Sequence, residues 1–201
     1  MLDLDEPLID GLIKTNEKIY DHLVLGKSFE ETLDDTSKKS FSLRYVDWEN
    51  ILNNEFHVTE EYSIEKLDGT ARRPDIVLFV NGIPLAVIEC KKTAISLKEG
   101  ISQTIRNQGK DEIPNLFKFS QILVSANKNE VKYATAGTAE KFWAVWKEED
   151  AETLDKHLKK IITTRLITEQ DKALYSVLSP ARLLELTRFY IVYDKNVKKI
   201  A

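Results

Sequence analysis

The segment from Arg72 to Lys92 limits the possible folds of this chain more than any other part of the sequence. Two apolar runs flank an Asn-Gly pair at positions 81–82, a pattern typical of two antiparallel strands joined by a tight turn. Asp75 opens the first strand, and Glu89 and Lys91 lie at the end of the second. Because an unpaired charge is costly to bury in a strand, these groups must be paired or hold a metal ion.

The register of this hairpin decides whether its charges can meet. A two-residue loop pairs Val80 with Ile83 and puts Glu89 on the opposite face of the sheet from Asp75. A three-residue loop, with a left-handed glycine at position 82, pairs Val80 with Pro84 and places Asp75 across from Glu89. We predict the longer loop, or a bulge with the same effect.

The alternation of side chains places Lys91 on the same face as Glu89 and turns Cys90 to the other face, into packing. Two carboxylates from neighbouring strands, with an ammonium beside them, suit a hard cation that prefers oxygen ligands, such as Mg²⁺ or Mn²⁺. Such an ion polarises a phosphodiester and activates water, and Lys91 would stabilise the charge that develops on the phosphate. A structural salt bridge is the alternative, but the complete string favours a nuclease.

The string Pro74-Asp75, followed by Glu89-Cys90-Lys91, resembles the Pro-Asp…(Asp/Glu)-x-Lys nuclease motif. With its surroundings, it closely resembles the N-terminal nuclease domain of the restriction (R) subunit of type I restriction-modification enzymes. The similarity runs from about Asn16 to the end of the chain. Besides the string from Arg72 to Gly82, the matching stretches are residues 53–56, 113–119 and 178–184.

The resemblance implies a role for each residue of the motif. Asp75 and Glu89 would bind the metal, with the backbone carbonyl of Cys90 as an additional ligand, and Lys91 would be the catalytic lysine. Related nucleases often carry a Gln-x-x-x-Tyr motif on the next helix. Gln103 matches the glutamine and is expected to be catalytic, although an ordinary exposed glutamine is the alternative, and Asn107 replaces the tyrosine.

Basic residues at both ends of the motif are candidates for contacts with DNA phosphates. Arg72 and Arg73 precede the first strand, and Lys92 follows the second. The alternative for the arginines is pairing with Glu60, Glu61 or Glu65. The formal net charge of −4 argues against a generally basic nucleic-acid-binding surface, so a DNA contact requires a local basic patch or help from other domains or subunits.

With 201 residues, 42% of them hydrophobic, the chain can bury a sizeable core. We predict an α/β fold, a restriction-endonuclease-like mixed central sheet flanked by helices, over residues 1–150, and a helical appendage over residues 151–201. Periodicity predicts helices over residues 6–24, 96–108 and 180–189, strands over residues 41–46, 55–65, 121–125 and 131–135, and a polar loop over residues 28–39. Residues 190–193 continue the apolar face of the last helix.

The sequence Gly26-Lys27-Ser28 copies the end of a nucleotide-binding P-loop. The glycine that such a loop needs five residues earlier is replaced by Asp21, so we reject nucleotide binding here. The resemblance implies that ATP acts only through a translocase domain that this sequence does not contain. The implied partners are double-stranded DNA and the modification and specificity subunits. Without a long apolar span or a signal-like start, we expect a cytoplasmic location and no membrane contact.

Two other functions remain open at this point. The chain can be a repair or mobile-element nuclease of the same superfamily, against which the matching stretches outside the motif argue. It can also be a non-catalytic docking module for DNA or another subunit that retains the acids as structural ions. Metal binding that depends on Asp75 distinguishes an enzyme from a docking module.

Overall fold

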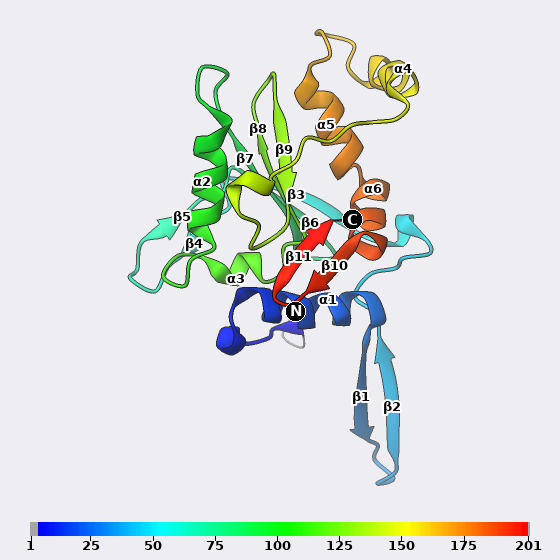
Figure 1. Cartoon of the computed structure of the whole chain (residues 1–201). Coiled ribbons are helices and arrows are strands. Elements are labelled where there is room, and N and C mark those ends of the chain that lie inside the picture. The colour runs from blue at the N-terminus through cyan, green and yellow to red at the C-terminus, as the bar shows by residue number, and fades with distance from the viewer. Residues whose placement is uncertain (1–3, 201) are drawn as a thin grey trace.

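In the computed structural model, which describes residues 4–200, the two apolar runs of the motif form neighbouring strands in the middle of a sheet (Figure 1). Within the described residues this sheet has five strands in the order β3-β6-β7-β8-β9. Its strands are β3 (Phe56–Glu60), β6 (Ile76–Val80), β7 (Ile83–Cys90), β8 (Ile122–Ala126) and β9 (Val131–Ala134). The pair β7 and β8 is parallel and the other neighbours are antiparallel, so the predicted mixed α/β fold is confirmed.

Helices cover both faces of this sheet (Figure 1). The α-helices are α1 (Leu12–Leu25), α2 (Leu97–Asn107), α3 (Pro114–Phe117), α4 (Ala151–Ile161), α5 (Glu169–Leu178) and α6 (Pro180–Phe189). On one face, Val87 of β7 packs in a core cluster with Ile101 of α2. On the other face, Leu85 shares a cluster with Ile19 of α1 and Leu186 of α6. In the part of the chain that the structure describes, no helix combines the length and apolar character needed to cross a membrane.

The turn between β6 and β7 is shorter than predicted, but positions 75 and 89 still lie opposite each other, as expected. Val80 pairs with Ile83 across a two-residue turn, so the three-residue loop was wrong. Asn81 and Gly82 both have positive φ, as a hairpin turn of this type requires. The register then shifts between Leu78 and Phe79, and the following pairs run to Ile76 opposite Ile88. This irregularity is the predicted bulge, and its register brings position 75 opposite position 89.

Two segments outside the sheet fold differently from their predictions. The predicted polar loop over residues 28–39 belongs to a hairpin of β1 (Lys27–Thr32) and β2 (Lys38–Leu43) that projects from the body (Figure 1). The last helix ends at Phe189 as predicted, but the helical character expected for the rest of the C-terminal segment was wrong, because a hairpin of β10 (Ile191–Asp194) and β11 (Val197–Ile200) follows α6. A further small pair joins β4 (Ile64–Glu65) and β5 (Ala71–Arg72).

The predicted N-terminal helix is divided near its start. A 3₁₀ helix, η2 (Leu8–Asp10), is followed by Gly11 and then by α1. Two further 3₁₀ turns are η3 (Ile51–Asn53) and η4 (Glu140–Phe142). Gly26 ends α1 and leads directly into β1, which is the reverse of the strand-loop-helix order of a P-loop. The expected lack of a leader rests partly on residues 1–3, which lie outside the described residues.

The C-terminal segment packs onto the sheet and α1. Leu183 and Leu186 of α6 belong to the same core cluster as Val80 and Leu85. Lys198 of β11 is buried, and its Nζ donates hydrogen bonds to Asn16 Oδ1 of α1 at 2.7 Å and to Gln121 Oε1 beside β8 at 2.6 Å. The division of the chain at residue 150 stays a prediction.

Candidate active site

Asp75 and Glu89 meet at one end of the β6–β7 pair. The Oδ2 atom of Asp75 accepts a hydrogen bond of 2.6 Å from the backbone N–H of Cys90, which fixes the start of β6 against the end of β7. Asp75 is also close enough to Glu89 for its negative charge to act on the Glu89 carboxylate. The structure therefore brings together the two carboxylates of the motif.

The carboxylate of Glu89 lies in an enclosed environment. Only 2% of the residue is exposed. Burial is the main reason that the pKa of Glu89 is raised, and the charge of Asp75 raises it further, whereas the hydrogen bond and the charge of Lys91 act in the opposite direction. Burial also raises the pKa of the Cys90 thiol. As predicted, Cys90 packs against the core cluster on the opposite face of the sheet.

Lys91 connects the acids with the following helix. Its Nζ donates to Glu89 Oε1 at 2.6 Å and to Gln103 Oε1 of α2 at 3.1 Å. Its backbone N–H donates to the carbonyl of Ala126 at 2.8 Å, which extends the parallel pairing of β7 with β8 by one residue. Four residues that the sequence singled out, Asp75, Glu89, Lys91 and Gln103, thus form one connected group. Asn107, one turn after Gln103, is buried instead.

Two residues that the sequence analysis did not identify lie where α2 packs closely against this group. Gly100 lies in α2 where a Cβ atom would come within 3.0 Å of Ser125 Oγ, 3.3 Å from Lys91 Cγ and 3.5 Å from Glu89 Cγ. Ser125 pairs with Glu89 across the parallel strands and is fully buried. A lone glycine inside a helical pattern is the signal that could have found this close approach, because it often marks a packing reason.

The three basic candidates for DNA contacts lie in different surroundings. Arg72 makes two hydrogen bonds to the carboxylate of Glu112, at 2.6 and 2.9 Å, an acid that the sequence did not indicate as its partner. Arg73 is exposed and lies 3.5 Å from Glu61, one of the alternatives that the sequence left open. Lys92 is exposed and directly follows Lys91. Their binding of DNA stays a prediction.

The donor set fits Mg²⁺ or Mn²⁺ better than a softer metal. Within residues 4–200, no group of three or more His, Cys, Asp and Glu side chains is arranged to hold an ion. Mg²⁺ does not require such a cage, because it is usually bound by one or two carboxylates, several waters and substrate phosphates. Asp75 and Glu89 supply two carboxylates, and a cation between them would offset the repulsion of two close negative charges.

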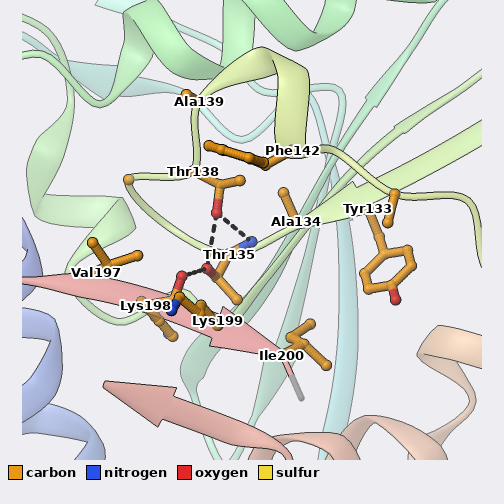
Figure 2. Close-up of a pocket in the computed structure, with 12 residues that line it drawn as sticks. Tyr133, Ala134, Thr135, Thr138, Ala139, Phe142, Val197, Lys198, Lys199 and Ile200 are labelled. Carbon is orange, nitrogen blue, oxygen red and sulfur yellow. Dashed lines mark hydrogen bonds between the residues drawn. The ribbon is translucent and has the colours of Figure 1, made fainter. Parts of the chain in front are cut away.

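The structure also contains a cavity that is separate from this group. About 430 Å³ in volume, it lies between β9, the following loop and β11 (Figure 2). Thr135 and Thr138 hydrogen-bond to each other at 3.0 Å on its wall, and Thr135 Oγ1 donates to the carbonyl of Lys198 at 2.8 Å. Its lining residues, all within the described range, include none of the predicted site residues.

Comparisons with known proteins agree with the motif. A family model described as "Type I restriction enzyme R protein N terminus" matches residues 3–142. The chain is 27% identical over 217 residues to the type I restriction enzyme HindI endonuclease subunit of Haemophilus influenzae, covering 98% of this chain and 20% of that protein. It is 30% identical over 168 residues to the type I restriction enzyme EcoprrI endonuclease subunit of Escherichia coli, covering 80% of this chain and 50% of that protein. The chain therefore spans half or less of the length of these relatives.

Proposed function

Because the chain belongs to the family of type I restriction enzyme R protein N termini, we propose that it is the domain that cleaves double-stranded DNA by metal-dependent hydrolysis. One observation carries the proposal. Lys91 Nζ lies between the carboxylate of Glu89 and the amide oxygen of Gln103, and Asp75 lies beside Glu89. Two acids and a cation at one site can hold a metal ion and stabilise the charge that develops during phosphodiester hydrolysis.

Each of these side chains has a distinct task in the proposed reaction. Asp75 and Glu89 would hold Mg²⁺ or Mn²⁺, with the Cys90 carbonyl as a further ligand, and the bound ion would supply Lewis acidity toward the phosphodiester. Lys91 orients the attacking water and stabilises the negative charge that develops on the phosphate. Gln103 accepts a hydrogen bond from Lys91 and so holds its ammonium in place, which makes Gln103 a positioning residue.

The proposal extends to the whole enzyme through the relatives. Their names describe endonuclease subunits of type I restriction enzymes, and the chain spans only part of their length. We therefore assign sequence recognition to the specificity and modification subunits and ATP use to a translocase domain elsewhere in the R subunit. The activity would be that of a type I site-specific deoxyribonuclease, dependent on ATP only in the full subunit. Family membership leaves the repair and mobile-element alternatives without support.

A plasmid cleavage assay tests the proposal. The complete R subunit that carries this chain, assembled with its modification and specificity subunits, ATP and Mg²⁺, should cut supercoiled plasmid, and Lys91→Ala should lower the rate by about 10²–10³, as loss of one transition-state stabiliser does. Lys156→Ala is the matched control, because this exposed lysine of α4 pairs only with Glu152 within the described residues and should cut normally.

The folding of the variant must be measured alongside its activity. Lys91→Ala leaves Glu89 buried without its cation, so thermal unfolding is recorded for each protein. A folded Lys91→Ala enzyme that cuts as fast as its parent would remove Lys91 from the mechanism. If neither protein cuts and neither binds metal, the docking-module alternative replaces the nuclease.

A further inference from the structure

A groove of about 570 Å³ runs along the exposed side of α2, directly beside the candidate active site. Lys91 and Gln103 line it, so it reaches the candidate active site through these two side chains. The same groove is lined by Lys98, Ser102 and Arg106, which are all exposed. The groove therefore continues the active site along the helix.

The spacing of these three residues fits a repeating polymer. Lys98, Ser102 and Arg106 follow one another at intervals of four residues, so they lie on one stripe of the helix. At about 1.5 Å per residue, the stripe extends about 12 Å along the axis from Lys98 to Arg106. Because phosphates of one strand are separated by about 3.4 Å along the axis of B-DNA, this length matches about three to four nucleotides.

The charge of the groove also favours a polyanion. Lys91 pairs with Glu89, whereas neither Lys98 nor Arg106 forms an ion pair among residues 4–200. The charge of Arg106 acts on Glu112, but that carboxylate forms its ion pair with Arg72. Arg106 makes one hydrogen bond of 3.1 Å, from Nη2 to the amide oxygen of its neighbour Asn107. Glu99 is the acid that lines the groove, against three cations. The groove is thus a local basic patch on a chain whose net charge is −4.

We infer that this face of α2 binds the sugar-phosphate backbone of one DNA strand, with Lys98 and Arg106 each contacting a phosphate on either side of the one that reacts, and Ser102 donating a third hydrogen bond. The inference rests on the proposed function, because it requires the reacting phosphate to lie at Lys91. It assigns to α2 a role in addition to the predicted DNA contacts of Arg72 and Arg73, which lie beside Glu112 and Glu61 in the structure.

Salt-dependent DNA binding tests the inference without requiring cleavage. The wild-type chain and the double variant Lys98→Ala/Arg106→Ala are titrated with a labelled duplex in EDTA, and fluorescence anisotropy is measured over a series of salt concentrations. Each phosphate contact contributes about 0.9 to the slope of log Kobs against log salt concentration, so the slope of the double variant should be smaller in magnitude by about 2.

Two matched variants separate charge from folding. Lys98→Arg/Arg106→Lys preserves both charges and should keep the wild-type slope, and Lys156→Ala removes an exposed lysine from α4 and should also keep it. All substituted positions are exposed, so thermal unfolding should be unchanged. An unchanged slope in the Lys98→Ala/Arg106→Ala variant would overturn the inference, as would a wild-type chain that does not bind duplex even at the lowest salt concentration.

A parallel cleavage measurement in the assembled enzyme, with Mg²⁺ and ATP, keeps the two proposals distinguishable. If the wild-type enzyme cuts DNA while the slope stays unchanged in the Lys98→Ala/Arg106→Ala chain, the proposed DNA binding by the groove is wrong and the proposed nuclease activity is retained. If the slope falls as expected but the wild-type enzyme does not cut, the binding face is right and the proposed hydrolysis is wrong.

Discussion

Glu89 shows at the scale of single residues why the motif needs its neighbours. A carboxylate that is 2% exposed and close to a second carboxylate is costly to keep charged, and burial and Asp75 both raise its pKa. Lys91 offsets part of this cost, and a bound divalent cation would offset more. The close approach of α2 at Gly100 keeps these groups together.

Gly100→Ala should destabilise the protein although alanine is the better helix former. Alanine gains about 1 kcal/mol of helix propensity over glycine, but the added Cβ would approach Ser125 Oγ within 3.0 Å, and overpacking of this kind costs about 1–3 kcal/mol. The shifted helix should also displace Lys91 and weaken metal binding. Urea unfolding measures the stability, and calorimetry with Mn²⁺ measures the binding.

The double variant Gly100→Ala/Ser125→Ala is the matched control. Removing Ser125 Oγ creates room for the new methyl group at the cost of one long hydrogen bond of 3.4 Å to the Leu97 carbonyl. We expect most of the lost stability to return. A Gly100→Ala protein as stable as its parent would show that α2 does not approach the strands as closely as described.

Lys198 gives a prediction about pH. Burial lowers the pKa of this lysine well below its ordinary value. Between that lowered pKa and the unfolded value of about 10.4, the unfolded chain binds a proton that the folded chain does not, so stability contributed by this residue rises with pH. The free energy of unfolding of wild type minus that of Lys198→Met should therefore increase with pH across this window, by up to about 1.4 kcal/mol per pH unit.

Lys199→Met provides the comparison for Lys198→Met. Lys199 is the neighbouring residue of β11, and its side chain is largely exposed beside Asp194. The free energy of unfolding of Lys199→Met, measured as a function of pH, should run nearly parallel to that of the wild type. Parallel profiles for Lys198→Met as well would contradict the description of Lys198 as a buried amine with a lowered pKa.

The sequence was informative about some residues of the site and silent about others. Asp75, Glu89 and Lys91 follow from one local string, and Gln103 follows from the helix after it, so their proximity could be predicted. The pairing of Arg72 with Glu112 could not be predicted, because 40 residues separate the two and the contact depends on how β5 meets the segment after α2. The contact of Gly100 with Ser125 depends likewise on helix-to-sheet packing.

At the scale of elements, the bulge in β6–β7 determines the site. A two-residue turn alone would have put Glu89 on the face opposite Asp75, and the register shift near Leu78 corrects this. The hairpin of β1 and β2 was missed because its sequence is nearly all polar, and alternation becomes visible mainly at Phe29 and Phe41, which pair across the strands. The C-terminal hairpin was missed because its apolar residues continue the pattern of α6.

Shortening the β1–β2 hairpin should leave the rest of the protein unchanged. Residues 30–40 are all exposed, so replacing them by an Asn-Gly turn between Phe29 and Phe41 removes little packing, and the free energy of unfolding should change by less than about 0.5 kcal/mol. Urea unfolding and Mn²⁺ binding measure the two properties. A large loss of stability would show that the hairpin supports the core.

At the scale of the whole molecule, the two faces of the sheet have different tasks. The face under α2 and α3 carries the acids and Lys91, and the groove continues from Lys91 along the exposed side of α2. The face under α1, α5 and α6 builds the larger apolar cluster. This larger apolar cluster combines residues near the two ends of the chain, such as Ile19 and Leu186. The family match covers residues 3–142 and so includes every residue of the proposed active site.

Calorimetric titration of the 201-residue chain with Mn²⁺ measures directly whether Asp75 and Glu89 bind a divalent ion. Asp75→Asn keeps an oxygen that can accept the hydrogen bond from Cys90, so the fold should survive while one ligand charge is lost. We predict a binding heat in the wild type that Asp75→Asn and Glu89→Gln each greatly reduce. Equal heats in the wild type and both variants, or no heat in any of them, would contradict a metal-dependent nuclease site.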